Sequence, residues 1–271
     1  MDDVVERLVA ALGEARRVVI VTGAGISAAS GLPTFRGNDP DALWSKDVTE
    51  IATAAYFRAD PVGWWRWFDR VFAGVLDAEP NDDHRAIARI EELMTARGAD
   101  FLLVTQNVDL LHERAGSRRR VKIHGTADRL RCSRRGCVHG EPEGSLPLAP
   151  SAFQAFRELP SLETVPRCPS CSSLVRAHAL LFDEYYTAHS DYAFERVEAA
   201  LDSADLMLFA GTSFSVGITA LAVEKGRARH IRMLSIDPFG KPPRPVEHLE
   251  AAAEAALPEV VRMMEKAGAR G

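Results

Sequence analysis

Four cysteines lie in two close pairs in the middle of the chain. Cys132 and Cys137 are separated by four residues, Cys168 and Cys171 by two, and thirty residues lie between the pairs. Two close thiol pairs on separate turns can supply one tetrahedral zinc ion with four thiolates, and no cysteine is left over. We therefore expect a structural zinc site, because four thiolates leave no open position for catalysis. A disulfide or a redox pair at Cys168 and Cys171 is the alternative.

A glycine-rich turn follows an apolar, β-branched run near the N-terminus. The run at 17–21 leads into Gly23, Gly25 and Ala28, which match the dinucleotide-binding pattern G-x-G-x-x-A. Pro33 is expected to end the next helix after about two turns, because the residue before a proline avoids helical geometry. We expect a nucleotide loop without the usual crossover helix. An ordinary glycine turn after a core strand is the alternative.

Polar side chains follow a second apolar run, which predicts a strand at 100–105. Gln106, Asn107 and Asp109 come directly after it. Ligands of a parallel sheet bind beyond the carboxyl ends of its strands, so these side chains lie where a dinucleotide would bind. His112 follows in the same segment, and we expect it to cap or pack locally.

Two further predicted strands end in groups with similar chemistry. The strand at 120–123 ends in His124, whose ordinary pKa near neutrality suits a general base. The strand at 205–210 ends in Gly211, Thr212 and Ser213, which offer backbone and hydroxyl donors to phosphate. Each could also be an ordinary structural residue or turn. Four strand ends with such groups together favour a dinucleotide site.

The elements that must position these groups form an α/β pattern. Strands without alternation are separated by segments with apolar residues three or four apart, which predicts a Rossmann-like parallel sheet with helices on both faces. The predicted helices span 2–13, 82–97, 190–202, 216–227 and 248–267, and one more strand spans 231–236.

Two segments interrupt this pattern. Residues 38–76 hold all four tryptophans, Trp44, Trp64, Trp65 and Trp67, in a stretch that we expect to be helical. Packing is the expected role of these rings, and an apolar substrate wall is the alternative. Residues 131–172 hold every cysteine and show no sustained periodicity.

Composition restricts the partners. The 271 residues are 46% hydrophobic, and 33 basic against 38 acidic residues give a net charge of −5, which argues against nucleic acid. The basic cluster at 118–122 is expected to be a solvated turn that enters a strand. The chain begins with acidic residues and has no apolar run of about 18 residues, so we expect no membrane association and a cytoplasmic location. The sequence sets no oligomeric state.

The quoted residues resemble the sirtuins, NAD-dependent protein deacylases, over about residues 5 to 262. The resemblance rests on the glycine loop with Ser30-Gly31-Leu32-Pro33 and Phe35-Arg36-Gly37, on Thr105-Gln106-Asn107-Val108-Asp109 with Leu111-His112 and Ala115-Gly116, on His124-Gly125, on the four cysteines, and on Gly211-Thr212-Ser213. It implies a large NAD-binding domain of residues 1–37, 77–127 and 174–271. A small domain would combine a helical module at 38–76 with a zinc-binding module at 128–173.

The resemblance also implies a mechanism. NAD is consumed: the acyl oxygen of a modified lysine attacks the nicotinamide ribose, nicotinamide leaves and an alkylimidate forms. His124 then deprotonates a ribose hydroxyl that attacks the imidate, and water releases lysine and O-acyl-ADP-ribose. An acylated-lysine protein or peptide is the implied partner. His124 and Asn107 are the implied catalytic residues.

The same resemblance assigns the remaining NAD contacts. Phe35 would cover the ribose, Asp109 and Val108 would hold the nicotinamide amide, and Gln106 and Asn107 would contact the ribose. Ser27 and Arg36 would lie on the phosphate side. The other implied contacts are Gly23, Ala24 and Gly25 in the loop, Gly211, Thr212 and Ser213 at the pyrophosphate, and Asp237 at the adenosine ribose.

The chain departs from the family pattern at several positions. Thr34 stands where many members carry aspartate, although the desuccinylase-type branch also has threonine there. Leu180, Phe182, Asp183 and Glu184 lie in the segment that pairs with the substrate peptide in the family, and Asp183 replaces the usual glycine. We expect an altered peptide preference.

The helical module bears on acyl choice. Desuccinylases use a tyrosine and an arginine three apart, and the matching residues here are Phe68 and Val71. A buried carboxylate would be unmatched there, at a cost of several kcal/mol, roughly. We therefore expect acetyl or longer apolar acyl groups rather than succinyl.

Other functions remain open at this point. ADP-ribosyl transfer to protein shares the displacement of nicotinamide. A catalytically weak NAD or ADP-ribose sensor would result if Asp183 disabled peptide binding, although the intact His124 and Asn107 argue against it. A zinc-ribbon nucleic-acid module is disfavoured by the acidic charge.

Overall fold

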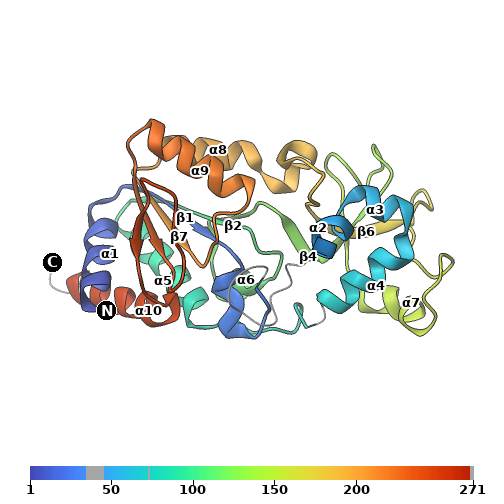
Figure 1. Cartoon of the computed structure of the whole chain (residues 1–271), viewed down its shortest axis with the longest axis horizontal. Coiled ribbons are helices and arrows are strands. Elements are labelled where there is room, and N and C mark those ends of the chain that lie inside the picture. The colour runs from blue at the N-terminus through green and yellow to red at the C-terminus, as the bar shows by residue number, and fades with distance from the viewer. Residues whose placement is uncertain (35–45, 73, 269–271) are drawn as a thin grey trace.

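The computed structural model describes residues 1–34, 46–72 and 74–268. Within these ranges the chain forms a larger α/β unit and a smaller unit beside it (Figure 1). Phe35, Arg36 and Trp44, which the sequence singled out, lie outside the described residues. No helix in the described ranges is long and apolar enough to cross a bilayer.

Six parallel strands form the larger sheet, in the order β3-β2-β1-β7-β8-β9. This parallel sheet confirms the expected fold class. The strands are β1 (Arg17–Thr22), β2 (Asp100–Thr105), β3 (Arg120–Lys122), β7 (Leu206–Ala210), β8 (Arg232–Ile236) and β9 (Glu247–Leu249). β1 lies at the centre, where its register with β2 runs from Arg17 opposite Asp100 to Thr22 opposite Thr105. Its apolar run is continuous because both faces of the sheet are covered.

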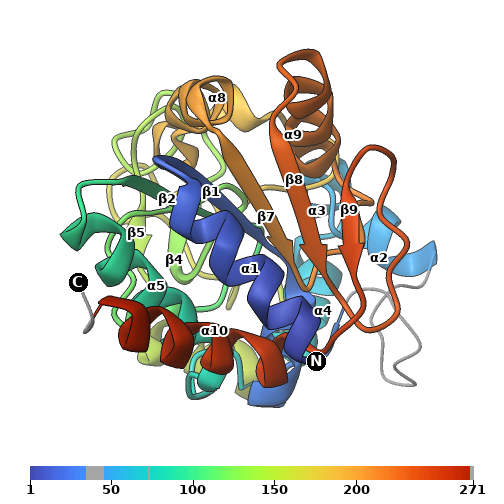
Figure 2. The same cartoon turned by 90° about the vertical axis from the view of Figure 1, so that its left-hand side faces the viewer.

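Helices cover the two faces of this sheet (Figure 2). One face packs against α1 (Asp2–Glu14), α5 (Asp82–Ala96) and α10 (Ala253–Gly268). The other packs against α8 (Phe194–Ser203) and α9 (Gly217–Ala228). Alternate residues of β1 contribute to the two cores, Val18 and Ile20 to the first and Val19 and Val21 to the second.

The smaller unit combines four α-helices and a 3-10 helix with a three-stranded antiparallel sheet (Figure 1). Its elements are α2 (Lys46–Ile51), α3 (Ala54–Ala59), α4 (Pro61–Val71), β4 (Gly125–Cys132), β5 (Leu146–Pro147), η2 (Pro150–Phe153), α7 (Gln154–Glu158) and β6 (Val175–Ala179). Trp64, Trp65 and Trp67 are buried in its core together with Cys132 and Cys168. These tryptophans therefore pack in the core, as expected, and Trp65 also lines a cavity described below.

Three expected helices differ in the structure. After Gly23 the chain forms a 3-10 helix, η1 (Ala24–Ser30). Gly31, in the left-handed region at φ 79°, ends this helix two residues before Pro33, which was expected to end it. The helix expected at 190–202 is divided by Ala193, also left-handed, into η4 (Ser190–Tyr192) and α8. The helix expected at 248–267 begins at Ala253, because the residues before it pair with β8 as the edge strand β9. Pairing with the preceding strand overrides local helical spacing there.

Candidate active site

Four adjacent strands of the larger sheet end at one edge, and the candidate residues follow them. The sheet order places the ends of β3, β2, β1 and β7 side by side. His124 lies after β3, residues 106–109 after β2, η1 after β1 and residues 211–213 after β7. The sequence-predicted groups of four strands are thus brought together at the carboxyl edge, the usual ligand site of such sheets.

The glycines of two loops allow the backbones after β1 and β7 to touch. Gly25 donates its N–H to the carbonyl of Gly211 at 2.9 Å. A Cβ on Gly23 would lie 2.8 Å from that carbonyl oxygen, and a Cβ on Gly211 would lie 2.4 Å from the nitrogen of Ile26. These glycines therefore permit a close approach of backbone to backbone, in addition to any approach to a ligand.

A buried hydrogen-bond chain links the loops after β1 and β2. The amide nitrogen of Asn107 donates to the Gly23 carbonyl at 3.1 Å and to the Ser27 hydroxyl at 3.0 Å. The Ser27 hydroxyl donates in turn to the carboxylate of Asp109 at 2.9 Å. Burial raises the pKa of Asp109, against the hydrogen bonds from Leu111 and Ser27 that lower it. Three of the implied NAD contacts thus position one another.

Gln106 extends this network toward β7. Its side-chain nitrogen donates to the carbonyl of Thr22 at 3.0 Å and to the hydroxyl of Thr212 at 3.1 Å. Ser213, the next residue, is exposed, and its hydroxyl donates to Ser215 at 3.0 Å. Ala24 and Val108 are half-buried. The loop after β7 therefore joins the other loops through side chains as well as through Gly211.

The imidazole of His124 is oriented by the loop after β2. Its Nδ1 lies 2.8 Å from the carbonyl oxygen of Gln106. A carbonyl only accepts, so Nδ1 carries the proton and Nε2 holds the lone pair. Burial lowers the pKa of His124 to about 4, and the bond to Gln106 only partly opposes this. The ring is thus neutral at pH 7, with its basic nitrogen defined.

The next residue, Gly125, is required by its surroundings. It lies at φ 80°, and a Cβ there would be 2.1 Å from the carbonyl of His178 on β6. Only glycine fits this close approach. In the pair His124-Gly125, the histidine is therefore the candidate base, and the glycine is required by its close packing against β6.

Two residues that the sequence reasoning missed lie directly against the site. Lys122 has only 12% of its side chain exposed, and its ammonium donates to the carbonyls of Val108, at 3.2 Å, and of Asp109. It lies at the end of the basic cluster, where a solvated turn was expected; that expectation is correct for Arg118 and Arg119, which are exposed, and wrong for Lys122. Tyr186, in η3 (Tyr186–Ala188), lies against His124 and had no signal in the sequence.

His112, in α6 (Leu111–Arg114), packs beyond its own segment. Its Nε2 lies 3.1 Å from the hydroxyl of Thr22 on β1, and its ring meets the ring of His84 edge to face. Burial holds the pKa of His112 well below its ordinary value. The expected local cap is therefore wrong: this histidine links β1 to α5.

The four cysteines converge as expected. Their sulfur atoms all lie within 4.8 Å of one another, and none forms a disulfide. The short contacts run between the pairs, at 3.4 Å for Cys132 and Cys171 and 3.6 Å for Cys137 and Cys168. A tetrahedron with zinc–sulfur bonds of about 2.3 Å has edges of about 3.8 Å. The set fits structural zinc and not a redox pair made from Cys168 and Cys171.

A second group of possible metal ligands consists of His178, His189 and Asp191, whose ligand atoms lie within 4.8 Å of one another. Nε2 of His178 lies 3.1 Å from the carboxylate of Asp191. His189 accepts the N–H of Asp191 at its Nδ1 and points Nε2 at the carbonyl of Gly144, so both of its ring nitrogens are used. Burial lowers the pKa of His178 to about 3, so its ring is neutral, and neither of its nitrogens has a hydrogen-bond partner among the described residues. Turn formation accounts for the contact of His189 with Asp191.

The segment expected to bind the peptide is tied to the smaller unit. The N–H of Leu180 donates to the carbonyl of His124 at 2.9 Å. Asp183 accepts the N–H groups of Ala54 and Ala55 at the start of α3, at 2.6 and 3.0 Å. Phe182 is exposed.

Glu184 binds two buried arginines. Its carboxylate pairs with Arg131 at 2.5 Å and with Arg176, and it also accepts the N–H of Leu181 at 3.0 Å. Because its charge is matched within the protein, Glu184 acts as an anchor of this segment.

Phe68 lines a cavity of about 110 Å³ between α4 and the zinc-bearing segment, whereas Val71 is not among the lining residues. Four of its eleven lining residues are aromatic, and Asp69, Asp77 and Arg157 add charge. The guanidinium of Arg157, which the sequence reasoning missed, is bound to the carboxylate of Asp69 at 2.6 and 2.9 Å. The other lining residues are Trp65, Phe72, Gly74, Leu76, Asp77, Ala127, Leu148 and Phe153.

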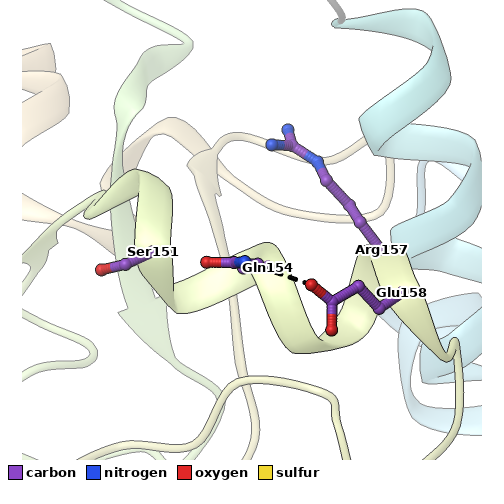
Figure 3. Close-up of a pocket in the computed structure, with 4 residues that line it drawn as sticks. All are labelled: Ser151, Gln154, Arg157 and Glu158. Atoms are coloured by element: carbon purple, nitrogen blue, oxygen red, sulfur yellow. Dashed lines mark hydrogen bonds between the residues drawn. The ribbon is translucent and has the colours of Figure 1, made fainter.

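A second hollow lies on the outer surface of η2 and α7 (Figure 3). It is lined by Ser151, Gln154, Arg157 and Glu158, and the side chains of Gln154 and Glu158 are hydrogen-bonded at 3.1 Å. All four are exposed side chains of one short stretch of chain. None belongs to the cysteine cluster or to the strand-end site, which consists of His124, residues 106–109, η1 and residues 211–213.

The remaining candidate, Asp237, follows β8. Its Oδ1 accepts the N–H groups of Phe239 and Gly240 at 2.8 and 2.6 Å, which closes a turn. Thr34 is the last residue before the first gap in the described ranges.

Comparison with known proteins agrees with this arrangement. The model of the Sir2 family matches residues 23–217. A protein of Pseudomonas aeruginosa named NAD-dependent protein deacylase 1 is 38% identical over 258 residues, which cover 93% of this chain and 95% of that protein. A relative from Thermus thermophilus, named NAD-dependent protein deacylase, is 36% identical over 239 residues, 88% of this chain and 85% of its own.

Solved structures are similar over nearly the whole chain. A mutant Sir2 homologue in complex with ADP-ribose superposes with a TM-score of 0.81 and 32% identity, covering 97% of this chain and 98% of its own. A Sir2 homologue in complex with NAD has a TM-score of 0.78 and 32% identity, with 97% and 94% covered. The chain is therefore a member of the Sir2 family.

Proposed function

We propose that this chain is an NAD-dependent protein-lysine deacylase that removes acetyl or longer apolar acyl groups and releases nicotinamide and O-acyl-ADP-ribose. The observation that carries this proposal is the neutral His124, whose Nε2 holds its lone pair at the edge where four strands end. A neutral imidazole with a defined basic nitrogen suits the removal of a proton from a ribose hydroxyl at pH 7.

The other residues of the strand-end site would bind and orient the substrates. NAD would supply the electrophilic ribose carbon and a leaving group, nicotinamide. Asn107, Ser27 and Asp109 form a chain of hydrogen bonds that is complete in the protein, so little reorganisation is needed when the ligand binds. We propose Val108 with Asp109 at the nicotinamide amide, and the loop of Gly211, Thr212 and Ser213 at the pyrophosphate.

The acyl preference is supported by the cavity beside Phe68. An apolar chain can be buried against its aromatic wall, whereas a succinyl carboxylate needs a free cation. The one guanidinium among the lining residues, that of Arg157, is bound by Asp69. The cavity thus favours acetyl and apolar acyl groups.

We also propose the division of the chain into two domains. The strand pairing favours a boundary slightly different from the one expected, because β4 and β6 pair from Gly125 opposite Ala179 onward. Both strands then belong to the small domain, which would include residues 125–179 rather than 128–173.

Protein ADP-ribosyl transfer is a second candidate, and Asp183 is the observation that favours it. This residue binds α3 from the segment that the family uses for peptide, which supports a mode of peptide binding different from the family pattern. The chemistry of nicotinamide displacement would be the same.

The test is an NAD-dependent assay over acetyl, decanoyl and succinyl peptides, with mass spectrometry of the products. We expect O-acyl-ADP-ribose from the first two peptides and little turnover of succinyl. His124→Ala should lower acyl transfer by about 10²- to 10⁴-fold while NAD still binds, because it removes the general base. His230→Asn, at an exposed left-handed position that asparagine tolerates, is the control. Near-normal turnover by His124→Ala, or an ADP-ribosylated protein as the main product, would contradict the proposal.

A further inference from the structure

Tyr186 contacts His124 from the segment between β6 and α8. Its phenol ring lies nearly parallel to the imidazole, with ring centres 5.9 Å apart and an angle of 10° between the planes. It is also parallel to the ring of Phe194, at 5.3 Å. The Tyr186 hydroxyl lies 3.5 Å from Nε2 of His124 and 3.0 Å from the backbone nitrogen of Ile218, in the first turn of α9.

The protons of this arrangement can be assigned from the donors and acceptors. The backbone N–H of Ile218 can only donate, so the Tyr186 oxygen accepts there. Nδ1 of His124 is committed as a donor to Gln106, so Nε2 of the neutral ring can only accept. The hydroxyl proton of Tyr186 is therefore the one that can point at Nε2. Burial raises the pKa of Tyr186, which keeps the phenol protonated.

We propose that Tyr186 is a positioning residue for the general base: its hydroxyl donates to Nε2 of His124 and its ring holds the imidazole plane. This inference rests on the function proposed above. At 3.5 Å the bond is long, so a ribose hydroxyl can replace the phenol at Nε2 when substrate binds. Tyr186 keeps its own proton throughout, and the proton removed from the ribose goes to Nε2.

The position of Tyr186 also links the base to two other elements. Its hydroxyl is fixed by α9, which begins after the loop of Gly211, and its ring is fixed by the start of α8. The two polar groups that contact the His124 ring in the described part of the chain are the Gln106 carbonyl and this hydroxyl. The orientation of the base is therefore set from both of its nitrogens.

The chain offers a matched pair of variants. Tyr186→Phe removes the hydroxyl and keeps the stacked ring, so the fold of η3 should be preserved. Tyr185→Phe makes the same chemical change at the neighbouring residue, whose side chain is 79% exposed. The two proteins can be compared in the full chain with zinc present.

The readout separates the two halves of the reaction. Exchange of labelled nicotinamide into NAD with an acetyl peptide precedes the step that needs the base, and we expect it to change little in Tyr186→Phe. Deacylation should fall about 3- to 10-fold, because the imidazole loses one of the two hydrogen bonds that orient it before the ribose hydroxyl binds. The acidic limb of the pH profile of kcat/KM should move to higher pH, because a donor at Nε2 favours neutral imidazole. Tyr185→Phe should match the wild type in all three.

Nitrogen NMR of histidine-labelled protein tests the contact without any turnover. The Nε2 resonance of His124 should move in Tyr186→Phe and not in Tyr185→Phe. An unchanged Nε2 resonance, or an unchanged ratio of exchange to deacylation, would overturn the inference. A wild type that neither exchanges nicotinamide nor deacylates would instead overturn the proposed function, and the NMR comparison would still decide whether Tyr186 binds His124.

Discussion

The strand-end site and the cysteine cluster are held together in opposite ways. The polar side chains after β1 and β2 bond to one another and to the backbone, as Asn107, Ser27 and Asp109 do. The four thiols approach one another within 4.8 Å, an arrangement that a cation stabilises once they are deprotonated. The sheet thus preorganises the site of chemistry, whereas a metal secures the smaller unit.

The packing around the two sites differs in the same way. The strand ends are fixed by a parallel sheet buried on both faces, with helices on each side. Cys132 and Cys168 belong to the core that contains Trp64, Trp65 and Trp67, a core built from short helices and a small sheet. A small core gains little from apolar burial alone, and metal binding adds to it.

Removing a ligand of the expected zinc ion should therefore have the largest effect on stability, and this effect should be confined to the smaller unit. Cys168→Ser should abolish stoichiometric zinc binding, since structural zinc contributes about 10 kcal/mol or more in small zinc domains. Tryptophan emission should move to longer wavelength, because Trp64, Trp65 and Trp67 share the core with the cysteines. Metal analysis and fluorescence measure both effects.

The control for this variant is Ser170→Ala, an exposed residue between the two cysteines of one pair. It should keep zinc and the wild-type emission. ADP-ribose affinity, measured by calorimetry, should fall far less in Cys168→Ser than deacylation does. Equal loss of ADP-ribose binding and of the tryptophan signal would contradict the separation of the two sites.

Glu184 connects the two regions, and its replacement has the next largest expected effect. Glu184→Gln would leave the buried Arg176 without its anionic partner and Arg131 with only the more exposed Glu141, at a cost of about 3–5 kcal/mol. Chemical denaturation should show this loss. Deacylation should fall as well, because the same segment carries Leu180 and Tyr186.

Glu141→Gln is the matched control. Its carboxylate pairs with Arg131 from a more exposed position, at 3.2 Å. Removing it leaves the bond to Glu184, so a loss of about 1 kcal/mol or less is expected. Equal losses of unfolding free energy in the two variants would show that burial of the Glu184 ion pairs adds nothing to stability.

The sequence predicted these two regions through different signals, and both are local. Continuous apolar runs predicted β1, β2 and β7, and the residues after them were found because strand ends of a parallel sheet share one edge. The spacing of Cys132, Cys137, Cys168 and Cys171 predicted their convergence. The resemblance to sirtuins then gave roles that neither signal contains.

The features that the sequence did not predict all depend on partners outside their own local segment. Tyr186 meets His124 across 62 residues, and Asp183 meets Ala54 across 129. The sequence placed Lys122 in a basic surface cluster, because the residues next to it in the chain do not indicate that its ammonium donates to the carbonyls of Val108 and Asp109. β9 was assigned to a helix because its pairing with β8 is invisible in local spacing. Local patterns predict elements, whereas these contacts depend on the packed structure.

Asp183 gives the smallest and most specific test of the comparison. Its carboxylate accepts the N–H groups of Ala54 and Ala55, while Thr53 caps the same helix from within by accepting the N–H of Tyr56. Because one cap remains, Asp183→Gly should cost about 1 kcal/mol. This should lower the melting temperature by about 2–4 °C for a chain of this size.

Asp183→Asn keeps one acceptor oxygen and should lose less than the glycine variant. NAD affinity should be unchanged in both, because the hydrogen bonds of Asp183 in the described part of the chain run to α3 and not to the strand-end site. The KM for acetyl peptide should change in Asp183→Gly without a change in kcat, since glycine restores the residue that the peptide-binding segment usually carries. A change in kcat with KM constant would place the effect at His124 instead. That outcome would mean that the segment from Leu180 to Tyr186 transmits strain to the base, and that the two regions are coupled through it.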